Sequence, residues 1–151
     1  EALLSCRGDD GTFSYGFPGR GGDETFSAGR GPHAEFALKL GGKSDDARVE
    51  AATIRSFEKH APYEAARKYD DHAPPHGIGG FFFFYDEMHR TDAIRSLSDA
   101  AKRRELLARQ REILLRLPEI DDRFVDSHEL GKPYGTACGL ICLKATAPDA
   151  P

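Results

Sequence analysis

One pattern repeats along this sequence: a glycine-rich loop, a nearly all-apolar helical segment, and then an amphipathic helical segment. The unit recurs about every 50 residues, a period typical of stacked helix pairs in which each unit has an apolar face that it cannot bury alone. Segments beginning near Pro32, Phe81 and Pro133 form the apolar part, and those near Ser44 and Asp99 form the amphipathic part. We therefore expect about three helical hairpins that pack side by side, with their apolar members inward.

The residue composition favours helices over strands. The 151 residues include 19 Ala and 13 Leu, against 2 Val, 6 Ile and 6 Thr. Ala and Leu are strong helix formers, whereas β-branched residues are typical of strands. The five consecutive aromatics Phe81–Tyr85 could alone form a buried strand, but Met88 and Leu97 continue them at helical spacing. We predict an all-α fold, with a single domain over residues 1–147 and a frayed tail over 148–151.

Start and stop signals divide the chain into helices separated by long, glycine-rich, ordered loops. Ser44 is the expected N-cap of one amphipathic helix and Pro62 its end, and Ser98 or Asp99 is the expected cap of the other. The first of these two helices is expected to bury a stripe of Ala47, Ala51, Ile54, Phe57 and Ala61. We predict helices over residues 1–6, 33–40, 44–61, 63–69, 81–97, 99–117 and 132–145.

The last two predicted helices differ in their apolar patterns. The segment from Tyr134 to Leu143 is apolar on all sides, which predicts a helix buried all round. Cys138 and Cys142 lie on one face of it and are expected to be small buried thiols, since 3 cysteines are too few for a disulfide framework. The helix before it is clearly periodic, with an expected buried face of Leu106, Leu107, Gln110, Ile113, Leu114 and Leu117.

Charge and hydropathy exclude two classes of partner. The chain has 21 Lys and Arg against 25 Asp and Glu, a net charge of -4, so it lacks the concentrated basic surface that nucleic-acid binding needs. No apolar run approaches the roughly 20 residues that span a bilayer, so we expect no transmembrane segment. No motif indicates a cofactor, and the sequence does not indicate a cellular compartment.

Several segments resemble the terpenoid cyclase and protein prenyltransferase superfamily, including squalene–hopene cyclase-like repeats. Residues 131–143 and 29–38 are similar to the inner-helix segments of that family, and Asp10–Phe13 and Asp122–Phe124 are similar to its aspartate-glycine-aromatic turn. The resemblance implies an α/α toroid, in which inner helices line a central cavity and outer helices surround them. The chain has segments for about three inner and two or three outer helices, so we expect an incomplete toroid, either a fragment, an open arc or one wedge of a complex.

The catalytic signatures of that family are degraded here. The nearest match to its Asp-x-Asp-Asp acid is Glu119–Asp122, with Asp121 and Asp122 as the candidate carboxyls. A proton donor of this kind needs a carboxyl held protonated in an apolar pocket, whereas these two lie beside Arg123 in an expected exposed loop. Gly135 stands where the zinc-binding histidine of the prenylating branch falls, so that zinc site is absent.

A histidine-rich segment is the densest set of metal-ligand residues in the chain. It combines His72, His76 and His89 with several aspartates and a glutamate. Histidine is common in metal sites but also in solvated loops, and the solvated loop is the preferred interpretation.

Two functions follow from these observations. The first is a non-catalytic helical-repeat interaction or structural module, a subunit or fragment of a larger assembly whose partners are other protein subunits. The alternative is a fragment of a terpenoid cyclase-like or prenyltransferase-like enzyme with an apolar isoprenoid-like ligand, whose cations aromatic rings would stabilise. We lean toward the first, because the catalytic motifs are missing. In either function the cavity-lining or interface residues would be Phe36, Phe81, Phe82, Phe84, Tyr85 and Tyr134.

Overall fold

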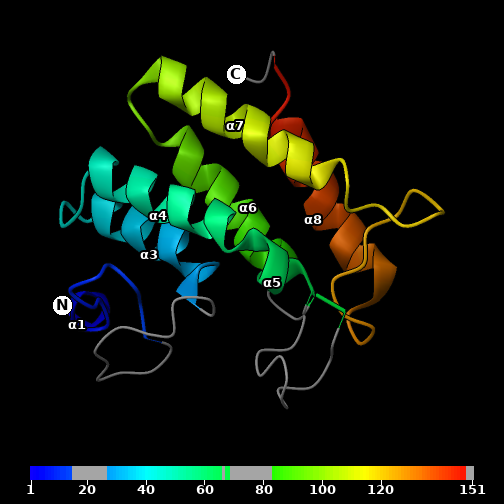
Figure 1. The fold of residues 1–151 in the computed structure, drawn as a ribbon, viewed down its shortest axis with the longest axis horizontal. Coiled ribbons are helices and arrows are strands. Elements are labelled where there is room, and N and C mark those ends of the chain that lie inside the picture. Colours follow the sequence, from blue (N-terminus) through cyan, green and yellow to red (C-terminus); the bar gives the residue numbers. More distant parts are fainter. Residues whose placement is uncertain (15–26, 66, 69–82, 149–151) are drawn as a thin grey trace.

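The computed structural model of the chain describes residues 1–14, 27–65, 67–68 and 83–148 (Figure 1). Apart from one isolated antiparallel bridge between Arg7 and Phe13, the described residues form no β-structure, and the all-α prediction is confirmed. No helix among them is both long enough and apolar enough to cross a membrane. The helices are α1 (Ala2–Ser5), α3 (Arg30–Leu40), α4 (Asp46–Glu58), α5 (His60–Ala65), α6 (Phe83–Arg95), α7 (Ala100–Leu114) and α8 (Gly131–Ala145).

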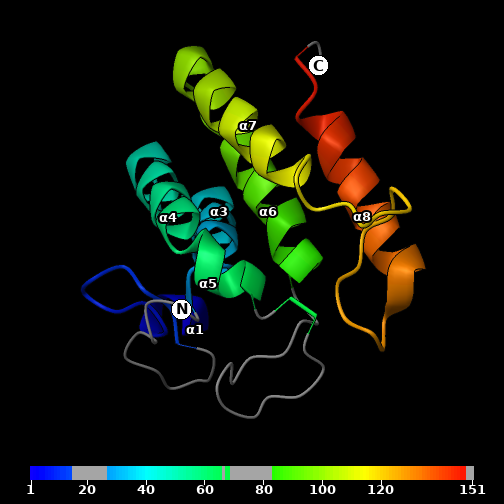
Figure 2. The same cartoon turned by 45° about the vertical axis from the view of Figure 1, so that its right-hand side comes forward.

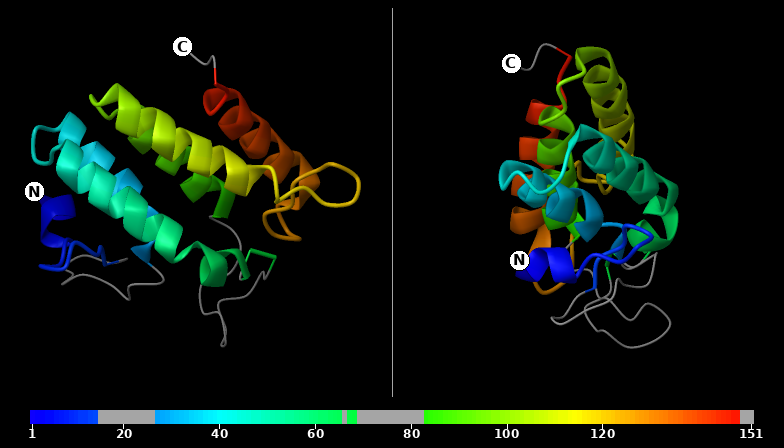
Figure 3. Two further views of the ribbon diagram at one scale, coloured as in Figure 1. Left: turned by 45° about the horizontal axis from the view of Figure 1, so that its top comes forward. Right: turned by 90° about the vertical axis from the view of Figure 1, so that its left-hand side faces the viewer.

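The long helices lie in two layers, which the right-hand view of Figure 3 shows most clearly. One layer contains α3, α6 and α8, with α6 packed between the other two. The second layer contains α4, which packs on α3 and α6, and α7, which packs on α6 and α8. As a result α6 packs against four helices, α3, α4, α7 and α8, whereas α8 lies at one edge of the molecule (Figure 2).

Aspartate side chains begin both helices of the second layer. Asp99 accepts hydrogen bonds from the backbone N–H groups of Ala101 and Lys102 at 2.8 and 3.1 Å, as its prediction as a cap requires. The prediction of Ser44 as the cap of α4 is wrong. Asp45 has the extended backbone of an N-cap and accepts from Arg48 N–H at 2.9 Å, while Ser44 donates to the Glu35 carboxylate instead.

The buried face of α4 also differs from the prediction. Ala47, Ala51 and Ala61 are exposed, and only Phe57 of the predicted stripe is fully buried. Alanine is small enough to sit on either face of a helix, so a stripe defined mainly by alanines indicates a direction poorly. The face that α4 does bury consists of Val49, Ala52, Thr53, Ser56 and Phe57.

The end of α4 lies earlier than predicted. The helix ends at Glu58, and Pro62 lies within the first turn of the next helix, α5, rather than terminating α4. Proline is tolerated there because the first turn of a helix leaves its N–H groups without intrahelical partners. The short helix predicted over 63–69 is therefore shifted, and residues 66 and 69 lie outside the described part of the chain.

The predictions for the last two long helices have opposite outcomes. The buried face of α7 is confirmed: Leu106, Gln110, Leu114 and Leu117 are fully buried, and Leu107 and Ile113 are half-buried. The prediction that α8 is buried all round is wrong, because the side chains of Leu140 and Ile141 are 57% and 53% exposed. The reason is positional: the helices that pack closely against α8 are α6 and α7, and its outer face points away from both.

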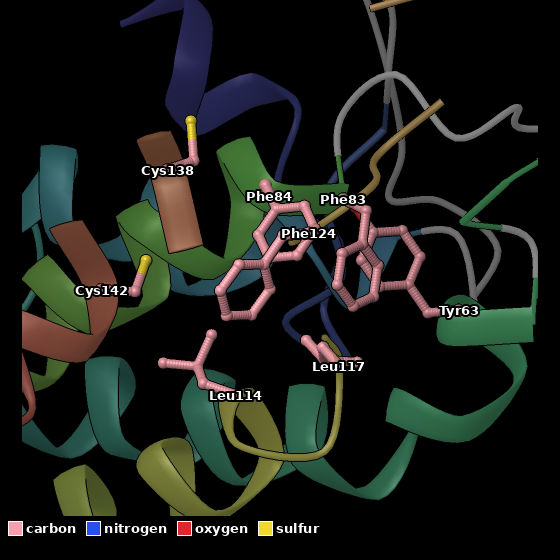
Figure 4. Close-up of a cluster of buried hydrophobic side chains, with 8 residues drawn as sticks. All are labelled: Tyr63, Phe83, Phe84, Leu114, Leu117, Phe124, Cys138 and Cys142. Carbon is pink, nitrogen blue, oxygen red and sulfur yellow. The ribbon is translucent and has the colours of Figure 1, made fainter. Parts of the chain in front are cut away.

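Aromatic rings from three segments form the core beside the start of α6 (Figure 4). The ring of Phe83 stacks on Tyr63 with centroids 5.2 Å apart, and Phe84 meets Phe124 edge-on at 5.4 Å. Fully burying one such ring contributes about 1.5–3 kcal/mol. The cluster also contains Leu114, Leu117, Cys138 and Cys142, so the prediction of buried thiols on one face of α8 is confirmed.

Candidate functional site

A group of carboxyl side chains lies where α6 begins, next to the aromatic core. The Tyr63 hydroxyl donates a hydrogen bond of 2.5 Å to Asp86 Oδ2. The adjacent Glu87 is 1% exposed, and Asp126, from the loop that leads to α8, is fully buried. We call Asp86, Glu87 and Asp126 the buried acidic cluster. Asp86 is half-buried, and the other two members are fully buried.

Burial changes the protonation of this cluster. It raises the pKa of Asp126 to about 7, although the backbone N–H groups of Phe84 and Phe83 oppose the shift. It also raises the pKa of Asp86 to about 6, against the hydrogen bond from Tyr63, and raises the pKa of Glu87. A carboxyl whose pKa lies near 7 is partly protonated at neutral pH.

Asp126 connects its loop to the first turn of α6. Its Oδ2 accepts a hydrogen bond of 3.0 Å from the backbone N–H of Phe84, one of the donors that the start of a helix leaves unpaired. Its Oδ1 is buried and has no hydrogen-bond partner among the described residues. The position therefore serves as an N-cap supplied from a distant part of the chain.

Glu87 belongs to a buried polar network that joins α4, α6 and α7. Its Oε2 accepts from Arg90 Nη2 at 2.5 Å and from Gln110 Nε2 at 2.8 Å. Arg90, which is 3% exposed, also donates to Gln110 Oε1 at 2.7 Å and to Ser56 Oγ at 3.1 Å. The Arg90 guanidinium further lies over the ring of Phe57, 4.7 Å from its centroid. The network therefore connects both long helices of the second layer, α4 and α7, to α6.

His60 lies at the edge of the same network. Its Nδ1 is 3.7 Å from Glu87 Oε1, beyond hydrogen-bond distance, and neither atom has a hydrogen-bond partner among the described residues. Burial and the nearby charges of Arg90, Arg109 and Arg67 lower the pKa of His60 to about 3. The imidazole is therefore neutral at physiological pH and forms no ion pair there.

Three glycines around the site lie so close to neighbouring groups that a larger side chain would overlap with them. A Cβ on Gly29 would overlap the Asp86 carboxylate, so only glycine fits beside the Tyr63–Asp86 pair. A Cβ on Gly135 would lie 2.8 Å from the Phe124 carbonyl oxygen, and one on Gly139 would lie 2.7 Å from the Phe124 ring. The two glycines of α8 thus allow the loop that carries Asp126 to lie against the helix.

The candidate acid predicted from the sequence lies elsewhere. Asp121 is exposed and forms an ion pair of 2.6 Å with Lys132, which lowers its pKa. Asp122 is also exposed and adopts a left-handed backbone conformation, with φ of 60°. Both therefore stand in a solvated turn. The carboxyl in apolar surroundings is Asp126, which sequence reasoning missed because the helix that it caps lies 42 residues earlier in the chain.

Of the histidines singled out from the sequence, His89 is described, and His72 and His76 lie outside the described residues. The half-buried ring of His89 contacts Tyr85 and His33, with centroids 4.2 and 4.1 Å away. Burial lowers the pKa of both His33 and His89. Within the described ranges, no group of three or more His, Cys, Asp or Glu side chains is placed to hold a metal ion.

The aromatic residues predicted to line a cavity or interface occupy different environments. Phe84 is fully buried in the core, and Tyr134 is half-buried against the same cluster. Phe36 is half-buried against the second apolar cluster, formed mainly by α4, α6 and α7, and Tyr85 is 40% exposed. Phe81 and Phe82 lie outside the described residues.

The largest exposure of apolar side chains lies in the C-terminal third of the described chain. Of the 8 large apolar residues that are exposed, 5 lie between residues 115 and 141. Sequence reasoning missed this concentration because it treated α8 as a fully buried helix. We call the exposed residues along α8 the uncovered α8 face; they are Pro133, Ala137, Leu140, Ile141 and Lys144.

Comparisons with models of protein families, with curated proteins and with solved structures found no match to this chain.

Proposed function

We propose that this chain is a non-catalytic helical-repeat module that docks within a larger protein assembly through its C-terminal third. The observation that carries the proposal is the uncovered α8 face, where Leu140 and Ile141 are more than half exposed although the helix packs against α6 and α7 on its other sides. Apolar side chains that are contiguous on a surface are typical of protein contact sites.

The burial pattern of one layer is compatible with the repeat. Each of its three helices buries residues at the spacing i, i+3, i+4 and i+7, which is general for a helix that buries one face and is also required of equivalent positions in stacked hairpins. The three sets are Gly31, Ala34, Glu35 and Leu38 in α3, then Glu87, Arg90, Thr91 and Ile94 in α6, and Gly135, Cys138, Gly139 and Cys142 in α8. An incomplete α/α toroid of the terpenoid cyclase and prenyltransferase type is the finer form of this proposal.

Dye binding and light scattering test the docking function. The wild-type chain is expected to bind a fluorescent dye specific for apolar surfaces and to associate as its concentration rises. The double variant L140K/I141K should bind less dye and associate less. The variant L40K, which changes a still more exposed leucine at the end of α3, should behave like wild type. A wild-type chain that stays monomeric at high concentration and binds no dye would contradict the proposal.

One observation favours the alternative, an acid-catalysed reaction of a cyclase-like enzyme on an isoprenoid-like ligand. Asp126 combines full burial beside Phe84 with a pKa of about 7, so its carboxyl can carry a transferable proton at neutral pH. Incubation with a polyisoprenoid epoxide tests this function. Turnover should be lost in D126N and kept in D122N, whereas absence of product from the wild-type chain argues against it.

A further inference from the structure

Two histidine rings meet where α3 packs against α6. His33 lies near the start of α3 and His89 in the middle of α6, and their ring centroids are 4.1 Å apart. The ring of Tyr85 contacts His89 edge-on at 4.2 Å and lies 6.0 Å from His33, so three rings from two helices pack together at this interface. We call His33 and His89 the imidazole pair. Neither the proposed docking function nor its alternative uses these two residues.

The contact between the two rings is favourable only while both are neutral. His33 Nδ1 is buried and has no hydrogen-bond partner among the described residues. A neutral imidazole can leave this atom unprotonated, whereas the charged form must carry an N–H donor there, and a buried donor without an acceptor is destabilising. Protonation of both rings would also bring two positive charges together, and their partial burial makes this repulsion stronger than in bulk water.

The charged groups around the imidazole pair offset little of this cost. Tyr85, His89 and Asp92 are four and three residues apart, so they share one face of α6. Asp92 favours the charged form of both histidines, but its Oδ2 is 3.9 Å from His89 Nδ1 and its side chain is 48% exposed, so solvent weakens the attraction. Other charged groups along α3, α4 and α6 form ion pairs of their own; these are Arg7–Glu35, Lys39–Asp46 and Glu87–Arg90.

The two interfaces of α6 respond to acid in opposite senses. Burial lowers the pKa of both histidines, and the charge of His89 lowers that of His33 further. The unfolded chain therefore binds more protons at these positions, and their contribution to stability is lost as the pH falls below about 6.5. Asp126, which joins the loop before α8 to the start of α6, has a pKa raised to about 7, so its contribution increases as the pH falls.

We infer that the imidazole pair is an acid-sensitive contact, which loosens α3 from α6 in mildly acidic solution while α6 stays packed against α8. Histidine suits this role because its charge changes in the mildly acidic range, and protonation of contacting histidines is a common way to open an interface. The switch lies within this chain and does not depend on the proposed docking function.

An NMR titration of the full chain tests whether the two rings are coupled. The histidine Cε1 proton signals are followed from about pH 8 to about pH 4.5 and are assigned with the variants H33F and H89F. Both midpoints should lie below the ordinary value of about 6.5, and the midpoint of His33 should rise in H89F, which keeps a ring but no charge. D92N should lower both midpoints. Midpoints at or above 6.5 in wild type, or a His33 midpoint that H89F leaves unchanged, would overturn the inference.

The consequence for packing is tested by comparing wild type with H33F/H89F, because titrations elsewhere in the chain are common to both. Between about pH 7.5 and pH 5 the melting temperature of wild type should fall by on the order of 5 °C more than that of the double variant. Hydrogen exchange at pH 5 should show less protection of α3 in wild type and equal protection of α8. An equal acid response of the two chains, or equal loss of protection in α3 and α8, contradicts the inference. If the double variant does not fold, H89F takes its place in this comparison.

Discussion

α6 and α8 are neighbours in one layer but differ in which side chains they bury. α6 is the more polar of the two in sequence, yet it buries Glu87 and Arg90 almost completely. α8 is nearly all apolar, yet it leaves Leu140 and Ile141 more than half exposed. The difference follows from position, because α6 is surrounded by α3, α4, α7 and α8, whereas α8 has neighbours on two sides only.

The comparison shows that burial in this protein is decided by the number of packed neighbours rather than by hydrophobicity. A central helix can bury charges where its neighbours supply complementary groups, as Ser56 and Gln110 do for Arg90. An edge helix exposes even leucine where no neighbour is present. The following substitutions test each side of this contrast, beginning with the most damaging.

The largest loss of stability is expected for R90M. Removing the guanidinium leaves the Glu87 carboxylate buried without its ion-pair partner, and breaking a buried pair in this way costs about 3–5 kcal/mol. Urea denaturation at pH 7 measures the change in the free energy of unfolding. The double variant E87M/R90M should recover much of the loss, since it removes the charge as well as its partner. Equal stability of R90M and wild type would show that the network is not a structural element.

A smaller loss is expected for G139A, on the buried side of α8. Its added methyl would lie 2.7 Å from the Phe124 ring, and overpacking of this kind costs about 1–3 kcal/mol. Thermal denaturation measures the loss. G41A is the matched control, because a Cβ at Gly41 meets only ordinary contacts at 3.5 Å or more, so its melting temperature should stay the same or rise. A G139A chain as stable as G41A would mean that the loop carrying Phe124 does not lie against α8 as described.

A pH-dependent difference is expected for D126N. Burial raises the pKa of Asp126 to about 7 in the folded chain, so between pH 4 and 7 the folded state binds more protons than the unfolded state. The wild-type carboxyl therefore contributes least at high pH, where it must be ionised while buried. D126N should be more stable than wild type by on the order of 2 kcal/mol at pH 8, and this advantage should disappear as the pH falls through 7 toward 4.

The control for this titration is D122N, in the exposed turn of the same loop. In chemical denaturation at pH 4 and pH 8 it shows what the loss of an exposed carboxyl from this loop does, and any gain in stability should be smaller than that of D126N. A parallel change in both variants would show that the effect of D126N is not due to burial.

Features of the fold that depend on residues close in the sequence could be predicted, and features that depend on the packing of distant helices could not. The caps and faces that depend on neighbouring residues, such as Asp99 and the buried side of α7, were predicted correctly. The buried face of α4 was predicted wrongly, because alanines fit either face of a helix. The burial of α8 was also predicted wrongly, because the sequence does not indicate how many helices pack against it.

The candidate site was the hardest part to predict. Tyr63, Asp86, Gln110 and Asp126 are drawn together from four separate segments, and none of the pairs lies at a spacing that a motif search uses. The acidic pair Asp121 and Asp122 attracted attention because it resembles a motif, although both residues lie in solvent. What distinguishes Asp126 is its burial, which only the packing of its loop against α6 and α8 creates.

The smallest effect on stability is expected where the comparison is most direct, at Ile141. The variant I141K places a charge on an apolar helix, yet the side chain at this position is 53% exposed and the lysine can reach solvent, so the free energy of unfolding should change by no more than about 0.5 kcal/mol. L106K, which puts the same charge on the buried face of α7, should be severely destabilised in the same urea titration. If I141K instead unfolds the chain, its outer face is covered within this protein and neighbour count does not distinguish α8 from α6. An I141K chain that is as stable as wild type but has lost partner binding would show that the uncovered α8 face serves association, because the fold itself does not require an apolar side chain there.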